Sequence, residues 1–321
     1  MPWRGDHAYE VVREALTKAK RLARRLVRVL GVDYGVVHVE GEPIDELGIR
    51  FHVPKKIAAS ALRVAELLPN RLESIRCDVL VASYRLHADE DPRTKLRPLR
   101  PGSSVGNVTH RKAGTLGCFV RTRADRRVAF LSNWHVLFGG ADARVGDEVS
   151  QPSVKFATGP AADVVGRLHR QAGLDRGYDA ATALVESGVD LNPRILGADV
   201  QPVDIIDVEP RMRLVKFGVT SGLTHGAVDG ILGSYEMNYE PYGDAKRWME
   251  GFRIVPDTEV EAPETEISLG GDSGAIWVEH DTGRAVGLHF AGEDGLGPSG
   301  EYALAHPIRP VIDLLEVDPF V

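Results

Sequence analysis

A series of short apolar runs, separated by turns rich in Gly, Asp and Pro, occupies the chain beyond about residue 105. Runs of this length at close intervals are typical of strands, and many short strands in succession predict a β-sandwich or a β-barrel. We therefore expect a mainly β domain over residues 105–321. The runs are CFVRT, RVAFLSN, DVVGRL, AATALV, RLVKFG, AVDGILGSYEM, GFRIV, GAIWV, AVGLHFA and YALAHPI.

The first part of the chain has a different pattern, in which helix and strand signals alternate. Apolar positions at helical spacing run through residues 7–30 and end at Gly31, which predicts an amphipathic helix with a solvated basic face. Strand-like runs and one helix-like segment, 58–68, follow in the order 34–40, 47–53, 58–68 and 77–86. That order predicts a small α/β domain over residues 1–104. The stretch 89–106 is charged and then rich in Pro and Gly, so we expect a linker there.

Charge and composition exclude several classes of protein. Residues 1–100 contain 19 Lys and Arg against 14 Asp and Glu, so this part carries +5 and the rest −12 of the net −7. The acidic larger part argues against nucleic-acid binding. We find no secretory signal pattern and no apolar stretch of about eighteen residues, so we expect a cytoplasmic protein without a membrane span. Cys77 and Cys118 are too few for a disulfide framework and are interpreted as buried thiols.

The motif Gly-Asp-Ser-Gly at residues 271–274 has two interpretations. Gly, Asp and Ser form tight turns at little steric cost, so the motif can simply connect two strands. It can also present Ser273 as a nucleophile beside backbone N–H groups that stabilise an oxyanion. A serine hydroxyl needs an imidazole to take its proton. Of the 11 histidines, His135 is the best candidate, because it directly follows the run RVAFLSN, where a strand gives way to a loop.

A catalytic imidazole also needs a carboxylate that holds its tautomer and stabilises its cation. Asp179 precedes the apolar run AATALV, where we expect it to be partly buried and aimed inward. Asp163, Asp175 and Asp190 lie in more polar surroundings and are weaker candidates, although geometry rather than spacing decides among them. The resulting order, histidine, aspartate and then serine, is one of the three unrelated orders in which catalytic triads occur.

These segments resemble the trypsin-like serine peptidases of the chymotrypsin fold. GTLGCFV followed by LSNWHVL is similar to the segment that leads to the family's histidine, YDAATALV to its aspartate strand, and GGDSGAIW to its serine loop. The resemblance covers about residues 105–321 and is specific because the three matches occur in the family's order. The stretch VKFGVTSGLTHGAV (215–228), with FAGEDG and YALAHPI, further resembles cytosolic relatives of the plant narrow-leaf protein and their bacterial counterparts, which also carry a leading α/β segment.

The resemblance implies a double β-barrel protease domain and a role for each residue of the triad. Ser273 would attack a peptide carbonyl, His135 would act as general base and then as general acid, and Asp179 would orient His135. The backbone N–H groups of Gly271 and Ser273 would form the oxyanion hole. In secreted members, the aspartate that matches Asp272 pairs with a new N-terminus freed by cleavage. This chain has no obvious activation site, so we expect control from elsewhere.

The resemblance also implies the positions that bind substrate. The edge that pairs with the substrate backbone as an added strand would be formed by Phe290, Ala291 and Gly292. Relatives that cut after basic residues carry an aspartate six positions before the serine, where this sequence has Ile267. Ser268 is polar, and His289 lies where the similar glutamyl endopeptidases have a histidine that faces the substrate's carboxylate. A histidine and a hydroxyl can bind an anionic side chain, which supports the hypothesis of a preference for Glu or Asp before the cut. The acidic charge of the domain argues against it, and His289 can also be a hydrogen-bonded core residue.

Two classes of function therefore fit the sequence. The first is a serine endopeptidase that acts on proteins or peptides, with an esterase of the same fold inseparable by sequence. The second is a protease-like binding or assembly module in which the triad is latent or inactive. Neither needs a cofactor or a metal, since the chain has no phosphate-loop or zinc-protease motif. The α/β domain can serve a regulatory partner or homo-oligomer assembly.

Overall fold

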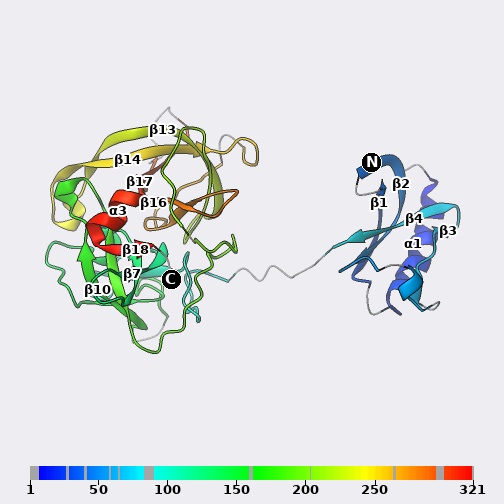
Figure 1. Ribbon diagram of the computed structural model, residues 1–321, viewed down its shortest axis with the longest axis horizontal. Helices are drawn as coiled ribbons and strands as arrows, with labels where there is room; N and C mark the ends of the chain where they lie inside the picture. Colours follow the sequence, from blue (N-terminus) through cyan, green and yellow to red (C-terminus); the bar gives the residue numbers. More distant parts are fainter. Residues whose placement is uncertain are drawn as a thin grey trace. The chain divides into compact units, whose positions relative to one another are not determined.

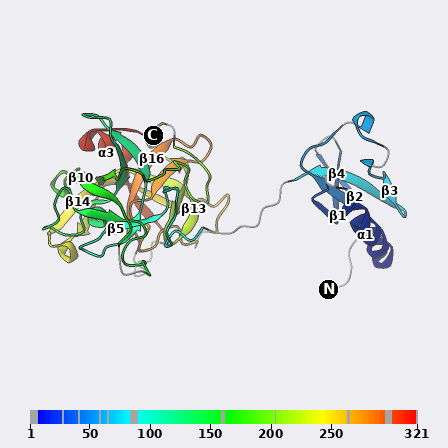
Figure 2. The ribbon, with the colours of Figure 1, turned by 90° about the horizontal axis from the view of Figure 1, so that it is seen from below.

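The computed structural model describes residues 7–26, 29–39, 42–57, 59–63, 66–82, 90–158, 162–202, 204–262, 265–293 and 300–319. The chain divides into two compact units, residues 1–88 and 89–321. The first is a small α/β unit and the second is almost entirely β, as the sequence predicts (Figure 1; Figure 2). In the described ranges, no helix combines the length and the apolar character needed to cross a membrane.

The α/β unit is built on one amphipathic helix, α1 (Tyr9–Ala23). The helix is shorter than the predicted 7–30, because the backbone N–H groups of Arg25 and Leu26 bond three residues back and tighten the chain out of α-helical geometry. Its apolar side packs on the sheet, as the helical spacing indicates. The fully buried side chains of this core are Val12, Ala15, Ala19, Ile49, Phe51 and Ile75.

The sheet of this unit has four strands in the order β1-β2-β4-β3. β1 pairs antiparallel with β2, and β2 pairs parallel with β4. The described part of segment 58–68, predicted as a helix, contains the short 3-10 turn η1 (Ala59–Ala61) and no α-helical residue, and its described side chains are exposed or half-buried. A segment that buries so little apolar surface has little to stabilise a longer helix. The strands are β1 (Gly31–Val39), β2 (Glu42–Val53), β3 (Arg71–Leu72) and β4 (Ile75–Val81).

The second unit begins with a curled eight-stranded sheet in the order β18-β7-β8-β11-β10-β9-β5-β6. β18 comes from the C-terminus and pairs with β7, as Figure 1 shows below the helix α3 (Ile308–Leu315). The C-terminal end of the chain therefore closes the side of the first sheet. The strands are β5 (Ser104–Asn107), β6 (Gly114–Thr115), β7 (Cys118–Thr122), β8 (Val128–Ser132), β9 (Glu148–Ser150), β10 (Val164–Gln171), β11 (Ala181–Val185) and β18 (Val317–Pro319).

The other six strands of the second unit close into a barrel in the order β12-β13-β14-β17-β16-β15. Short helical turns occur in the connections of both sheets: α2 (Trp134–Leu137), η3 (Leu174–Arg176) and η4 (Glu240–Tyr242). The strands are β12 (Arg213–Gly218), β13 (Gly222–Asn238), β14 (Lys246–Pro256), β15 (Ile276–Glu279), β16 (Ala285–Gly292) and β17 (Ala303–Pro307).

Part of the predicted linker belongs to the second unit. The side chain of Leu99 is fully buried, and its backbone bridges to Leu191. Val105 is also fully buried, and it lies in β5. A few apolar side chains thus anchor a segment whose charged and Pro-rich composition is otherwise typical of a linker. The division between the units accordingly falls at 88/89 rather than at the predicted 104/105.

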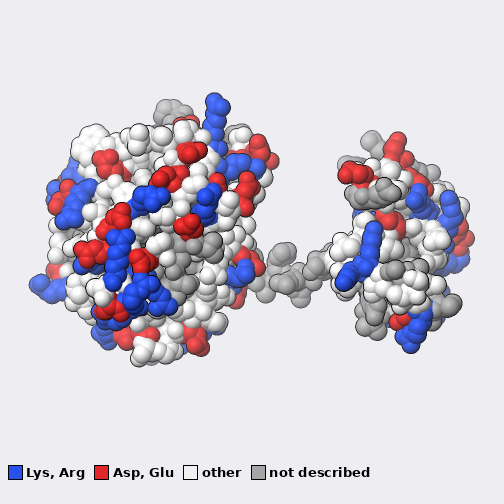
Figure 3. Space-filling model, viewed as in Figure 1, with Lys and Arg blue, Asp and Glu red and all other residues white. Residues whose placement is uncertain are grey.

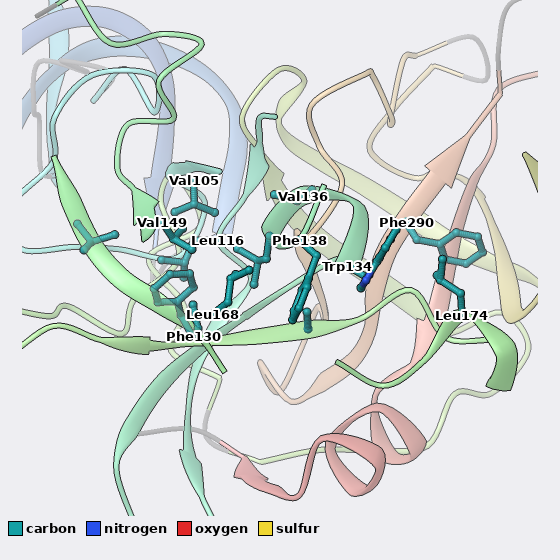
Figure 4. Close-up of a cluster of buried hydrophobic side chains, with 14 of the residues drawn as sticks. Val105, Leu116, Phe130, Trp134, Val136, Phe138, Val149, Leu168, Leu174 and Phe290 are labelled. Carbon is teal, nitrogen blue, oxygen red and sulfur yellow. The ribbon is translucent and has the colours of Figure 1, made fainter. Parts of the chain in front are cut away.

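One apolar cluster of the second unit joins residues of both sheets (Figure 4). Phe130, Trp134 and Phe138 come from β8 and the α2 segment, and Phe290 comes from β16 of the closed barrel. The cluster therefore includes side chains of α2 itself. On the face of this unit drawn in Figure 3, basic and acidic side chains are interspersed.

The two cysteines differ in burial. Cys118 is fully buried as predicted, whereas Cys77 is only half-buried. Burial raises the pKa of both thiols, that of Cys77 to about 11. Both side chains are therefore neutral, weakly nucleophilic thiols at neutral pH.

Candidate active site

His135 lies on the one-turn helix α2, which directly follows strand β8. Its ring atom Nδ1 donates a hydrogen bond to Asp179 Oδ2 over 2.5 Å, and its backbone N–H donates to Asp179 Oδ1 over 3.1 Å. Because a carboxylate only accepts, Nδ1 carries the proton and Nε2 is left as the basic atom. The side chain of His135 remains 13% exposed, whereas that of Asp179 is fully buried.

Asp179 is brought to His135 by the register of two neighbouring strands. It lies two residues before β11, whose Ala181 pairs with Ser132 at the end of β8. The Asn133 side chain donates to the Asp179 carbonyl over 2.6 Å and joins the same two segments. Among the four candidate aspartates, Asp179 is thus the one in contact with His135, whereas Asp163 pairs with Lys95 and Arg97.

The carboxylate of Asp179 is fully buried and well supplied with donors. The Tyr239 hydroxyl donates to Oδ2 over 2.7 Å, in addition to the two bonds from His135. Burial alone would raise the pKa of Asp179, but the charge of His135 and the hydrogen bonds from His135 and Tyr239 outweigh it and lower the pKa. Asp179 is therefore an anion at neutral pH. Burial and the neighbouring carboxylate raise the pKa of Tyr239, which keeps that phenol protonated as a donor.

A second buried histidine holds the backbone of Asp179. The Asp179 N–H donates to His306 Nε2 over 3.0 Å, so His306 carries its proton on Nδ1 and donates it to the Glu250 carbonyl. Burial, as the largest cause, lowers the pKa of His306 to about 4, so its ring is neutral. The Phe290 ring stacks on it at a centroid distance of 4.1 Å. Sequence analysis missed Tyr239 and His306, since both lie far from Asp179 along the chain.

Ser273 lies in the turn that precedes strand β15. Its carbonyl accepts from Thr115 N–H over 2.7 Å, and Gly274 N–H donates to the His289 carbonyl over 2.9 Å. Any Cβ on Gly114 would meet both the Ser273 carbonyl, at 2.7 Å, and the Val136 side chain, at 2.3 Å. The serine turn and the histidine helix therefore approach the same glycine. Among the hydrogen bonds of the described residues, none joins the Ser273 hydroxyl to His135.

The backbone beside Ser273 leaves two donors open. Gly271 has a φ of +114°, a conformation that disfavours residues with a Cβ, and a Cβ there would lie 2.5 Å from Thr220 Oγ1. The Gly270 carbonyl accepts from Thr220 Oγ1, and the Gly271 carbonyl accepts from Thr115 Oγ1, each over 2.9 Å. No described residue accepts a hydrogen bond from the N–H of Gly271 or of Ser273. These two donors are available to a negatively charged oxygen.

Asp272 anchors the serine turn through a buried ion pair with Lys216. Both side chains are fully buried, and Lys216 Nζ lies 3.3 Å from Asp272 Oδ2 and 2.8 Å from Ser221 Oγ. Burial would raise the pKa of Asp272, but the Lys216 ammonium and the surrounding donors lower it. Backbone N–H groups that complete the shell of this carboxylate come from Thr220, Ser221 and Leu269.

The predicted substrate-binding residues fall into three pairs. Ile267 is fully buried in the core of the closed barrel, and Phe290 is 4% exposed within the cluster of Figure 4. Ala291 and Gly292 are half-exposed at the end of β16. The remaining pair is in contact, since a hydrogen bond of 3.0 Å joins Ser268 Oγ to His289 Nε2. A Cβ on Gly292 would lie 2.3 Å from the same Ser268 oxygen, so the hydroxyl borders the end of β16.

His289 carries no positive charge at neutral pH. It is 1% exposed, and burial, followed by the charge of Lys216, lowers its pKa to about 3. Its Nδ1 is buried without a partner among the described residues. A neutral ring can still share a proton with Ser268, but it supplies no cation for an acidic substrate side chain.

Solved structures similar to this chain are bacterial serine proteases. A Nocardiopsis protease is 15% identical, covers 70% of this chain and 100% of its own, and has a TM-score of 0.50. Thermobifida fusca protease A and a glutamic acid specific serine protease with a histidine triad in substrate binding are each 16% identical, cover 68% of this chain and 98% of their own, and have TM-scores of 0.47. No family model and no curated protein matches the chain.

At this level of identity, the likeness to the Nocardiopsis protease establishes the fold and leaves the activity to be inferred from the site. The chain therefore has the double β-barrel fold of the chymotrypsin-like serine proteases, as the sequence predicts. The narrower resemblance to relatives of the plant narrow-leaf protein stays a prediction.

Proposed function

We propose that this protein is a serine endopeptidase that uses Ser273, His135 and Asp179 as its catalytic triad. The observation that carries the proposal is the buried Asp179 carboxylate, which binds both the ring and the backbone of His135. This contact fixes the tautomer in which Nε2 is free to accept a proton, and it stabilises the imidazolium that forms during the reaction. A purely structural histidine would need neither.

The reaction proceeds through an acyl-enzyme. Ser273 Oγ attacks the carbonyl carbon of a peptide bond while His135 Nε2 takes the hydroxyl proton. The C–N bond of the tetrahedral intermediate then breaks, and His135 returns the proton to the leaving amine. A water molecule then gives a proton to His135 and attacks the serine ester, and His135 returns that proton to Ser273 Oγ as the acid leaves. The open N–H groups of Gly271 and Ser273 stabilise the oxyanion, and removal of one such donor typically costs about 10²–10³ in rate.

The Lys216–Asp272 ion pair supports a site that is ordered without proteolytic activation. A buried aspartate beside the nucleophile needs a cation, and here Lys216 supplies it from strand β12 of the same unit. We infer that the serine turn does not await a new N-terminus. Control then falls to other parts of the molecule, which is consistent with a separate unit ahead of the protease.

The remaining assignments are part of the same proposal. Residues 89–321 form the protease domain, and the half-exposed end of β16 at Ala291 and Gly292 receives the substrate backbone as an added strand. The α/β unit of residues 1–88 binds a regulatory partner or mediates homo-oligomer assembly. We assign the enzyme to the cytoplasm, with protein or peptide substrates, no nucleic acid or membrane as partner, and no cofactor.

One observation favours a second candidate, a protease-like module with a latent triad. The described Ser273 hydroxyl and His135 ring are not joined by a hydrogen bond. In serine enzymes without substrate this contact is often long and tightens only in the reacting complex. A latent module would instead keep the Ser273 hydroxyl and the His135 ring apart until a partner binds.

Labelling with a fluorophosphonate probe separates the two candidates. We expect the full-length wild type to be labelled on Ser273 alone, and Ser273→Ala and His135→Ala to be unlabelled, as read by mass spectrometry of the modified peptide. The control is Ser234→Ala, since Ser234 is an exposed serine on β13 bonded to Glu250. A folded wild type that stays unlabelled would favour the latent module.

A further inference from the structure

Glu301 is a buried carboxylate with one satisfied and one unsatisfied oxygen. Its Oε1 accepts from the N–H groups of Ile267 and Ser268 over 3.0 and 3.1 Å. Its Oε2 is buried and has no partner among the described residues, and the whole residue is only 8% exposed. An open oxygen on a buried carboxylate is costly, so a native chain that keeps one has a use for it.

Two further carboxylates increase the negative charge at this place. Oxygen atoms of Glu266, Glu293 and Glu301 lie within 4.8 Å of one another. Burial, as the largest cause, raises the pKa of Glu301 to about 7. The charges of Glu266 and Glu293 also raise this pKa, and the two backbone hydrogen bonds lower it. The Lys216 ammonium also acts on Glu301, but it is bonded to Asp272. No described Lys or Arg forms an ion pair with Glu301 or Glu266.

This cluster adjoins the segment that leads to the nucleophile. Ile267 and Ser268, which hold the Glu301 carboxylate, lie six and five residues before Ser273. The Ser268 hydroxyl in turn borders Gly292, at the end of the strand to which we assign the substrate backbone. The carboxylate of Glu301 is therefore bonded to the segment that leads to Ser273, next to the hydroxyl that borders the end of β16.

We propose that Glu301 accepts the cationic side chain of a Lys or Arg residue that precedes the scissile bond, with Glu266 and Glu293 adding to its negative potential. This inference rests on the proposed peptidase function. The two N–H groups on Oε1 hold the carboxylate, and Oε2 accepts from the ammonium or guanidinium group, which restores the charge balance of the cluster. It replaces the hypothesis of an acidic preference, because the cluster carries anions and His289 beside Ser268 is neutral.

A divalent cation is the competing occupant of three clustered carboxylates. Ca²⁺ takes six to eight oxygen ligands, and Mg²⁺ requires near-octahedral geometry. Here Oε1 of Glu301 is already engaged by two backbone donors, so the buried member of the cluster offers only one oxygen. One open acceptor suits an ammonium or guanidinium group, which needs one or two acceptors, better than a metal ion.

The test compares wild type with Glu301→Gln, which keeps an oxygen for the N–H groups of Ile267 and Ser268 and loses only the charge. Peptide substrates are matched except for Arg, Lys, Gln or Glu before the cut. We expect the wild type to prefer Arg and Lys over Gln by about 10- to 100-fold in kcat/KM, as for a charge-assisted hydrogen bond. Glu301→Gln should lose this ratio while Ser273 is still labelled by fluorophosphonate. The control is Glu236→Gln, an exposed acid paired with Lys246.

Two outcomes would overturn the inference while leaving the peptidase intact: a labelled wild type without the cationic preference, or a preference that survives in Glu301→Gln. A rise in melting temperature on adding CaCl₂ that Glu301→Gln abolishes, with substrate preference unchanged, would make the cluster a metal site instead.

If the wild type is unlabelled and inactive, the binding of benzamidine, measured by calorimetry, still tests the inference. The two proteins compared are Ser273→Ala and the double variant Ser273→Ala with Glu301→Gln. Binding that is about tenfold weaker in the double variant supports the inference, and equal or absent binding in both refutes it.

Discussion

Asp272 and Glu301 are buried acids that differ in how their charge is balanced. Asp272 directly precedes Ser273, whereas Glu301 binds the backbone of Ile267 and Ser268 at the start of the same segment. Asp272 has a lysine and three backbone donors, so both of its oxygens are engaged. Glu301 has two backbone donors on one oxygen and no partner among described residues on the other. The opposite directions of their pKa shifts, down for Asp272 and up for Glu301, express this difference.

The comparison separates charges that hold the chain from charges that await a ligand. A fully partnered carboxylate costs little to bury and stiffens whatever supplies its donors, which for Asp272 is the serine turn. Asp179 belongs to the same class, although its donors include the reacting histidine. A half-partnered carboxylate adds no such stiffness at its open oxygen. Each prediction below removes a partner or a charge from one of these acids.

Asp179→Asn should give the largest effect. An asparagine of the same shape can donate to the His135 ring and so stabilise the wrong tautomer, and in triads of this kind such a change lowers kcat by about 10⁴-fold. The fold should persist, since the side chain keeps its size. Fluorophosphonate labelling rates, with circular dichroism as the check on folding, measure the loss. A labelling rate within tenfold of wild type would remove Asp179 from the triad.

Lys216→Met should be the most destabilising change among the partners of these acids. It leaves Asp272 as an unpaired charge in a dry site, which typically costs about 3–5 kcal/mol in the free energy of unfolding. Urea denaturation measures that cost. Adding Asp272→Asn removes the stranded charge, so the double variant should recover part of the stability. Equal stability of the single and double variants would mean that the ion pair does not balance Asp272.

The sequence was sufficient for the residues that carry their own local signal. His135, Asp179 and Ser273 each lie where a strand-like run meets a turn, and this is where the structure places them. The mainly β fold followed from the same runs. The contact between His135 and Asp179 could be expected only from the resemblance, because strand register is set by the whole sheet.

The partners of the buried acids could not be predicted, because they come from strands distant in sequence. Tyr239 lies 60 residues from Asp179, Lys216 lies 56 from Asp272, and Glu301 lies 34 from Ile267. No periodicity links such pairs, and Lys216 was noted only as part of a family-like signature. The predicted linker failed for a related reason, since the burial of Leu99 depends on a surface that the local composition does not reveal.

Tyr239→Phe tests whether Asp179 depends on a donor outside the triad. The variant removes one hydrogen bond to a buried carboxylate, and bonds of this kind contribute about 1.5–3 kcal/mol. We expect a loss of this size in the free energy of unfolding and a much smaller loss of activity than for Asp179→Asn. Tyr242→Phe is the matched control, because its ring also lies beside His135, 5.4 Å between centroids, while its hydroxyl bonds to no described residue.

Glu301→Gln should change stability in the opposite sense to the other variants, and only above about pH 5. Because the folded-state pKa of Glu301, about 7, lies above its ordinary value, the folded chain holds this proton more tightly than the unfolded chain. The carboxyl therefore lowers stability as pH rises from about 4.5 to 7. Glu266 and Glu293 strengthen this dependence, Lys216 weakens it, and His289, with a pKa of about 3, stays neutral throughout.

Melting temperatures of wild type and Glu301→Gln between pH 5 and pH 8.5 would measure this dependence. The variant should match wild type near pH 5, where Glu301 is protonated, and exceed it near pH 8, where the wild type carries the unbalanced charge. Glu236→Gln should show no such divergence, because Glu236 is an exposed acid paired with Lys246. A Glu301→Gln variant that is less stable than wild type at pH 8 would place Glu301 with Asp272 among the acids that hold the chain. That result would argue against the proposal that Glu301 Oε2 is kept unpaired to bind a cationic substrate side chain.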